Sequence, residues 1–231
     1  MNIQGYQKLT LLDFPGKVAC TVFTGGCNLR CPFCHNAGLV KTPCEFPNAE
    51  EEVLSYLAAR KTILKGVCVT GGEPLLQPDL LSFIQKVKDL GLAVKLDTNG
   101  GLPQKLKRAI ESGLIDFIAM DVKSAPETYE KAVGVPVNVN AFLESMQLIK
   151  ESGVPHEFRT TAVKGLHSET DFIEIAKLVD SSPYYLQKFT DSGNLIDGEG
   201  FSSFTDGEMT DLLKKVKQFA PNASARGYDL D

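Results

Sequence analysis

Short apolar runs alternate along the chain with longer segments whose apolar residues recur at helical spacing. Several of the runs are rich in Val or Ile, as is typical of buried parallel strands. They cover residues 18–23, 66–70, 93–98, 117–122, 157–163 and 184–189. This alternation predicts an α/β fold in which right-handed crossovers join parallel strands and the helices lie outside. Six such units form either a curved, partly closed barrel or an open doubly wound sheet, and periodicity does not choose between them.

The segments between the runs carry helix start signals. Pairs typical of a capping box, three residues apart, open three predicted helices: Asn48–Glu51, Ser168–Asp171 and Thr205–Glu208. No internal repeat, low-complexity stretch or linker divides the chain. We therefore expect one domain over residues 1–231, with a core over about 15–190 and a C-terminal helix and tail over 200–231.

Composition and charge exclude several classes of partner. A chain of 231 residues can bury a core without disulfides or zinc. Its net charge is −5 and it has no long basic run, which argues against a nucleic-acid partner. It has neither a secretory leader pattern nor 18 consecutive apolar residues. The sequence thus predicts a cytoplasmic protein with no membrane partner.

Three of the six cysteines lie within eight residues, directly after the first predicted strand. Cys27, Cys31 and Cys34 have the spacing C-x3-C-x2-C. Thiolates suit iron–sulfur clusters or zinc. Structural zinc takes four ligands, and the nearby fourth donors are His35 and the more distant Cys44. Three thiolates fit better with a four-iron cluster that leaves one iron open to a small molecule; zinc and unligated cysteines stay as alternatives.

The remaining cysteines and two of the histidines have no such pattern. Cys20 and Cys68 lie inside predicted strands, where a free cysteine acts as a small hydrophobic residue. Cys44 lies in a proline-flanked loop and is expected to be a surface thiol. We expect His156 and His167 at the surface or as helix caps.

Glycines and polar residues gather at or near the ends of the predicted strands, where α/β folds hold their ligands. In chain order they are Gly71, Gly72, Glu73, Asp97, Asn99, Asp121, Lys123, Arg159 and Gln187. These residues could bind a ligand, but several of them also have a purely structural interpretation. Gly71-Gly72-Glu73 alone would be a turn, Asp97 a helix N-cap and Asp121 part of a surface ion pair.

The cysteine motif and the segments around it resemble a known family. C-x3-C-x2-C with an aromatic residue, Phe33, before the third cysteine is the signature of the radical S-adenosylmethionine (SAM) superfamily. Three segments are similar to the activases of glycyl radical enzymes, and most of all to the activating protein of anaerobic (class III) ribonucleoside-triphosphate reductase. These segments are Asp13-Phe14-Pro15-Gly16, Phe23-Thr24-Gly25-Gly26-Cys27 and Cys34-His35-Asn36.

The resemblance implies a partial (β/α)6 TIM-like barrel, with one [4Fe–4S] cluster on Cys27, Cys31 and Cys34. It also implies that SAM binds the open iron and is cleaved reductively to methionine and a 5′-deoxyadenosyl radical. Glu73 would accept a hydrogen bond from the SAM amino group. The SAM-binding residues that it implies are Phe33, His35, Gly71, Gly72, Glu73, Asp97, Asn99, Asp121, Lys123, Arg159 and Gln187.

In the activases, the acid pair that corresponds to Asp97 and Asp121 lies near the SAM carboxylate. Two acids facing a carboxylate need a positive charge between them, so the resemblance implies a monovalent cation there, or Lys95 or Lys123 nearby. Asp13 is implied at the loop that receives the glycine of the partner.

The leading functional hypothesis is an activase that abstracts a hydrogen atom from a glycine of a large glycyl radical enzyme. Anaerobic ribonucleoside-triphosphate reductase is the favoured partner, partly because no ferredoxin-like insert lies between Asn36 and Gly66. The electron donor would be a low-potential flavodoxin or ferredoxin. One alternative is a radical SAM enzyme that acts on a small molecule or peptide. Another is a non-enzymatic iron–sulfur or zinc electron carrier, which leaves the glycine-rich and acidic strand ends unexplained.

Overall fold

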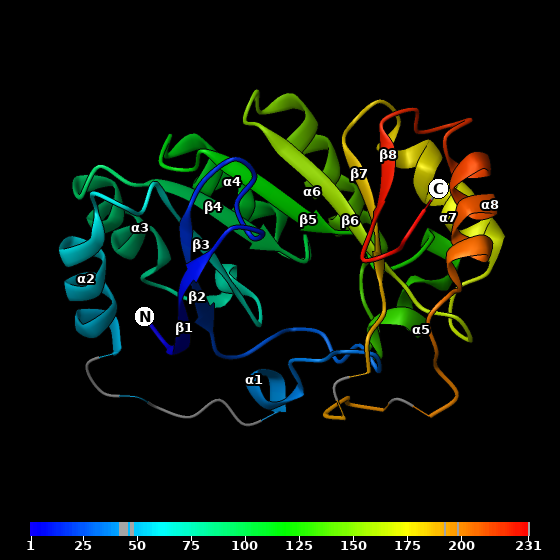
Figure 1. Ribbon diagram of the computed structural model, residues 1–231, viewed down its shortest axis with the longest axis horizontal. Helices are drawn as coiled ribbons and strands as arrows, with labels where there is room; N and C mark the ends of the chain where they lie inside the picture. Colours follow the sequence, from blue (N-terminus) through cyan, green and yellow to red (C-terminus); the bar gives the residue numbers. More distant parts are fainter. Residues whose placement is uncertain (42–45, 47–48, 192, 198, 231) are drawn as a thin grey trace.

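In the computed structural model, eight strands form one sheet whose spatial order follows the chain (Figure 1). β1 pairs with β2 antiparallel, and all later neighbours pair in parallel. The structure describes residues 1–41, 46, 49–191, 193–197 and 199–230. The strands are β1 (Ile3–Thr10), β2 (Ala19–Thr24), β3 (Gly66–Gly71), β4 (Ala93–Thr98), β5 (Phe117–Asp121), β6 (His156–Ala162), β7 (Tyr184–Lys188) and β8 (Ala223–Arg226).

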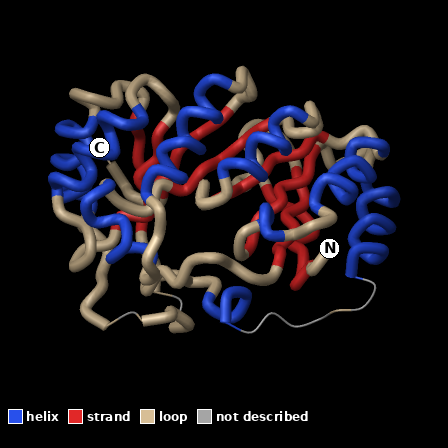
Figure 2. Tube along the Cα trace, turned by 180° about the vertical axis from the view of Figure 1, so that it is seen from behind, coloured by secondary structure: helices blue, strands red, loops and turns tan. Residues whose placement is uncertain are grey.

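Most of the helices lie on the outer side of the curved sheet, as seen from both directions in Figures 1 and 2. They are α1 (Ala37–Lys41), α2 (Ala49–Arg60), α3 (Leu80–Asp89), α4 (Pro103–Glu111), α5 (Tyr129–Val133), α6 (Val139–Glu151), α7 (Glu169–Val179) and α8 (Asp206–Val216), with 3₁₀ turns η1 (Pro74–Leu76) and η2 (Pro126–Thr128). No helix in the described part of the chain is long and apolar enough to cross a bilayer.

The six predicted strands are confirmed as β2 to β7, and the sheet is a partial, TIM-like barrel. Two edge strands, β1 and β8, were not predicted. β1 mixes polar and apolar residues without a continuous apolar run, because only one of its long sides pairs within the sheet. β8 has four residues and lies within the segment expected to be a tail after the last helix. No pairing joins β8 to β1 among the described residues, so the barrel stays open.

Local capping chemistry starts the later helices where the sequence predicts. Ser168 and Asp171 form a reciprocal capping box at the start of α7, and Thr205 and Glu208 do the same for α8. The predicted cap at Asn48, like Cys44, lies outside the described residues.

The two faces of the sheet differ in chemistry because neighbouring side chains of a strand point to opposite sides. The outer face is apolar and fully buried under the helices, as at Val22, Leu96 and Ile118. The inner face carries polar side chains from alternate positions, such as Thr21 and Arg159. The helices therefore stabilise the barrel from outside, and its interior is left available for a site.

Candidate active site

A cavity of about 320 Å³ lies inside the curved sheet. It brings together all the predicted site residues except Glu73. These are Asp13, Cys27, Cys31, Phe33, Cys34, His35, Gly71, Gly72, Asp97, Asn99, Asp121, Lys123, Arg159 and Gln187. Residues of seven strands, β1 to β7, and of the loops between them thus line one cavity, as expected where parallel strands bring their ends together.

Backbone hydrogen bonds fix the cysteine loop that follows β2. Gly26 N donates to Leu39 O at 2.9 Å, and Cys34 N donates to Cys31 O at 3.0 Å. From outside the loop, Asp197 N reaches Pro32 O at 2.9 Å. The cysteine loop is therefore tied both to α1 and to the segment after β7.

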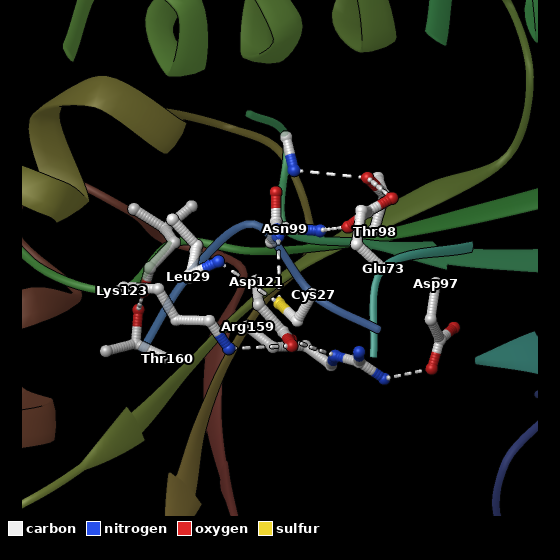
Figure 3. A network of polar contacts seen from close by, with 12 residues as sticks. Cys27, Leu29, Glu73, Asp97, Thr98, Asn99, Asp121, Lys123, Arg159 and Thr160 are labelled. Carbon is white, nitrogen blue, oxygen red and sulfur yellow. Dashed lines mark hydrogen bonds and ion pairs between the residues drawn. The ribbon is translucent and has the colours of Figure 1, made fainter. Parts of the chain in front are cut away.

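The three cysteines of this loop are free thiols that face the same cavity. Burial raises the pKa of Cys27 and raises that of Cys31 to about 12, so the thiolates need a nearby positive charge to form. Two N–H groups point at the Cys27 sulfur, Leu29 N at 3.4 Å and Asn99 Nδ2 at 3.7 Å (Figure 3). Three thiols that face one cavity, with N–H donors to the sulfur of Cys27, fit an iron–sulfur cluster.

Among the described residues, no three His, Cys, Asp or Glu side chains are placed to hold a single metal ion. Cys20 and Cys68 are fully buried, as predicted for small hydrophobic residues.

A chain of alternating charges crosses the cavity wall from β4 to the end of β5 (Figure 3). Arg159 lies at its centre and binds Asp121 at 2.8 Å and Asp97 at 3.1 Å. Lys95 pairs with Asp97, and Lys123 with Asp121 at 3.0 Å. The group that separates the two acids is therefore the guanidinium of Arg159, where the sequence predicted a lysine or a monovalent cation.

These contacts hold both acids in their charged forms. Burial alone would raise the pKa of each carboxyl, but Arg159 together with Lys95 or Lys123 lowers the pKa of Asp97 and of Asp121 below the usual range. The five side chains carry one more positive than negative charge and suit an anionic ligand group. Asp97 is not a helix N-cap, since Leu102 has that position in α4. A monovalent cation here stays a prediction.

Glu73 is fully buried beside the cavity and does not line it. Its carboxylate accepts hydrogen bonds from Asn99 N at 2.7 Å, Thr98 Oγ1 at 2.9 Å and Leu75 N at 3.0 Å. Burial raises its pKa to about 7 despite these donors. The described geometry therefore makes Glu73 a brace between the ends of β3 and β4, and its hydrogen bond to the SAM amino group stays a prediction.

Gly71 and Gly72 allow the loop after β3 to lie against the cysteine loop. A Cβ on Gly72 would be 1.9 Å from Gly26 O, and one on Gly71 would be 2.4 Å from Thr24 N. Gly71 also has φ +113°, a conformation that side chains disfavour. These glycines thus have a packing role that the sequence did not indicate, and both still line the cavity.

His167 is buried, where the sequence placed it at the surface or in a cap. Its Nδ1 accepts from Val163 N at 3.2 Å, so Nε2 carries the proton and donates to Lys123 O at 2.8 Å. Its ring lies edge-on to Phe33, 6.1 Å between centroids. One histidine therefore supports two residues of the site.

Several residues that line the cavity or contact a lining residue were not predicted from the sequence, and one of them, Asn28, is a polar residue inside the cysteine motif. Asn28, next to Cys27, accepts from Asn99 Nδ2 at 2.8 Å. Gln7 lies on the unpredicted β1, and Thr21 lies inside an apolar run. Thr21 Oγ1 donates to Asp13 at 2.5 Å, which holds the Asp13 carboxylate beside the barrel interior.

Comparison with known proteins identifies the family. Residues 21–179 match the Radical SAM superfamily. A Methanocaldococcus jannaschii protein, named provisionally as a glycyl-radical enzyme activating enzyme, is 31% identical over an alignment of 236 positions that covers 97% of this chain and 95% of that protein. GTP 3′,8-cyclase of Aquifex aeolicus is 31% identical over 224 positions, covering 92% and 69%. The structure of Streptococcus suis SuiB bound to S-adenosylmethionine shares the fold, with a TM-score of 0.70 at 15% identity over 87% of this chain and 48% of SuiB, so this chain spans about half of that structure's length. The chain belongs to the radical SAM superfamily.

Proposed function

We propose that this radical SAM enzyme is an activase, which takes a hydrogen atom from a glycine of anaerobic ribonucleoside-triphosphate reductase. The observation that carries the proposal is the 31% identity to the activating-enzyme relative along nearly the whole of both chains. The cavity supports it, since the lining extends from the cysteines to Asp13, which precedes the opposite end of β2. A glycine segment entering beside Asp13 would face the cysteine end.

Membership of the family implies a [4Fe–4S] cluster and SAM. When bound, the reduced cluster supplies one electron that cleaves SAM into methionine and a 5′-deoxyadenosyl radical, which takes the glycine hydrogen. Cys27, Cys31 and Cys34 would hold the cluster. The N–H groups of Leu29 and Asn99 would stabilise the Cys27 thiolate through their hydrogen bonds to its sulfur.

The other lining residues would orient SAM. Lys123 and Arg159 would attract its carboxylate, while Asp97 and Asp121 hold these two cations in place. The aromatic ring of Phe33 and the side chains of His35 and Gln187 would form walls for the remaining parts of the molecule, and the backbone of Gly71 and Gly72 would lie along the methionine moiety. Residues 1–231 would act as one domain, with reducing electrons from a low-potential flavodoxin or ferredoxin.

The test is electron paramagnetic resonance on the anaerobically reconstituted protein with dithionite, SAM and the large reductase encoded in the same genome. A glycyl doublet on the reductase, with one 5′-deoxyadenosine formed per radical, is the expected result. SAM cleavage with no radical on that protein would contradict the proposal.

A radical SAM enzyme acting on a small molecule is the second candidate. It is favoured by the similarity to the Aquifex aeolicus GTP 3′,8-cyclase, which covers 92% of this chain. Incubation with GTP in place of the reductase distinguishes the two, because a cyclase consumes the nucleotide and an activase does not.

A further inference from the structure

Four of the six large apolar side chains that are exposed in the described chain lie at one end of the barrel. Leu9, Leu11 and Leu12, in β1 and the turn after it, are 49%, 68% and 88% exposed, and Ile63 after α2 is 52% exposed. This turn, blue in Figure 1, lies at the opposite end of the sheet from α1. Lys65 N donates to Val18 O at 2.8 Å, which joins the segment around Ile63 to the same end.

The leucines lie in and beside a turn whose conformation is fixed by hydrogen bonds and by packing. Thr10 Oγ1 accepts from Leu12 N and Asp13 N, each at 3.2 Å. Phe14, two residues further, is 2% exposed and packs so closely on Gly66 that a Cβ there would be 2.8 Å from its ring. The exposure of Leu11 and Leu12 therefore does not arise from a loose loop, and the fold makes no use of their side chains. Such a patch on a held surface indicates a contact with another molecule.

The two chain segments that carry these leucines and Ile63 have a charge opposite to that of the whole chain. Residues 5–18 and 59–66 contain one acid, Asp13, whose carboxylate is bound to Thr21. The same segments contain five basic residues, Lys8, Lys17, Arg60, Lys61 and Lys65, although the chain as a whole has a net charge of −5. An apolar centre with a basic rim is complementary to an apolar protein surface with acidic side chains at its edge.

This surface is continuous with the cavity. Gln7 and Asp13, on either side of the three leucines in the chain, both line the cavity, and the lining continues along β2 through Thr21 and Phe23 to Cys27. A protein held on the leucines would therefore have the barrel interior directly beside its contact. A small-molecule substrate would need no such surface.

We propose that Leu9, Leu11, Leu12 and Ile63, with the basic residues around them, form the docking surface for the protein whose glycine segment enters the cavity beside Asp13. The occupant is the large partner of the proposed function, on which this inference rests, and its contacting face is apolar with an acidic edge. Docking at this end places the partner opposite the cysteine loop, so the cysteine loop stays free for an electron donor while the partner is bound.

The test is a titration of glycyl radical formation against the large anaerobic ribonucleoside-triphosphate reductase encoded in the same genome. In the double variant Leu11→Ser/Leu12→Ser, the reductase concentration for half-maximal radical should rise at least tenfold. Iron content and SAM cleavage without the reductase should stay at wild-type values, since both side chains are exposed. Phe219→Ser, an exposed apolar residue after α8, is the matched control and should leave the titration unchanged.

A second variant tests the charge. In Lys8→Glu/Lys61→Glu, the reductase concentration for half-maximal radical should also rise. Added salt should raise the same concentration for the wild-type chain. If both double variants titrate like the wild type, and the wild-type chain forms a normal radical on the reductase, the docking surface is contradicted and the proposed activase function is not. The same holds if Leu11→Ser/Leu12→Ser only converts a dimer of this chain to a monomer in sedimentation. If the wild-type chain forms no radical on the reductase, the proposed function is contradicted, and so is this inference, which rests on it.

Discussion

Arg159 on β6 and Asp121 on β5 are register partners in the parallel sheet, and their side chains form a 2.8 Å ion pair inside the barrel. Because register partners point to the same face, the sheet itself sets this contact. The same guanidinium reaches Asp97 on β4, which is not the neighbouring strand. Arg159 thereby joins three strands at the end where the cavity holds its charged residues.

Arg159→Met should destabilise the protein by about 1.5–3 kcal/mol near pH 7, because it removes the cation that the buried Asp97 and the half-buried Asp121 share, while each acid keeps a lysine partner. The pKa values of Asp97 and Asp121 lie below those of the unfolded chain, so these acids contribute stability above about pH 4, and that contribution is lost as the pH falls further. In the variant Lys95 and Lys123 still pair with these acids, but the loss of the guanidinium should raise both pKa values, so the two acids should contribute less stability above pH 4 than they do in the wild type. Denaturant unfolding at several pH values measures both effects.

Arg108→Met is the matched control, since Arg108 is an exposed residue of α4. It should change the free energy of unfolding by less than about 0.5 kcal/mol. An Arg159→Met profile parallel to that of the wild type would show that the acids do not depend on the guanidinium.

Periodicity and spacing predicted the parts of this molecule that local sequence determines. The six inner strands follow from their apolar runs, and the capping boxes at Ser168 and Thr205 follow from residues three positions apart. β1 could not be found this way, because an edge strand with one paired side needs no continuous apolar run. β8 is stabilised by pairing with β7 and by contact with α8, which a four-residue segment does not encode.

The candidate site likewise has a part that the sequence predicted, the residues themselves, and a part that it did not, their contacts. Strand-end polar residues were located because parallel strands bring their ends together. The contacts of Arg159 with two different strands, of Glu73 with Asn99 and of His167 with Lys123 join residues 25 or more positions apart. Such pairings depend on crossover lengths and side-chain direction, so the sequence indicated the residues and not their partners.

The three cysteines of the loop after β2 should be required for the cluster, and the other cysteines should not. Anaerobic reconstitution should give about four iron and four sulfide per chain, the stoichiometry of a [4Fe–4S] centre. Cys27→Ala, Cys31→Ala and Cys34→Ala should each abolish it. Iron and sulfide analysis with visible absorption is the measurement. Cys20→Ala and Cys68→Ala serve as buried controls, and a zinc-containing product without charge-transfer absorption would contradict the assignment.

Glu73→Gln should flatten the pH dependence of stability between about pH 4.5 and 7. The folded-state pKa of Glu73 is raised to about 7, so the folded chain holds this proton more tightly than the unfolded chain does. Its contribution is present below the unfolded pKa and is lost as the pH rises through 7, by about 3 kcal/mol at most. Asp97 and Asp121 titrate below this window, which keeps the effects separate. Chemical unfolding from pH 4.5 to 8 is the measurement, with the exposed Glu111→Gln as control.

The last prediction concerns Asp13, whose carboxylate faces the cavity at the end of β2 opposite the cysteines. A carboxylate there can accept hydrogen bonds from the backbone N–H groups of an entering glycine segment, and such contacts set how the target C–H meets the SAM 5′ carbon. Asp13→Ala should therefore cut the glycyl radical yield at least tenfold, while SAM cleavage in the absence of the partner falls less than twofold.

Two further variants separate this role from a structural one. Thr21→Val removes the 2.5 Å hydrogen bond to Asp13 and keeps the carboxylate, so it should retain most of the radical yield. Asp13→Asn keeps an acceptor oxygen without the charge and should fall between wild type and Asp13→Ala. Radical yield by electron paramagnetic resonance and 5′-deoxyadenosine by chromatography are measured on the same samples. Equal losses in both assays for Asp13→Ala would place this residue in the structure of the turn, because a residue that only positions the partner cannot slow a reaction from which the partner is absent.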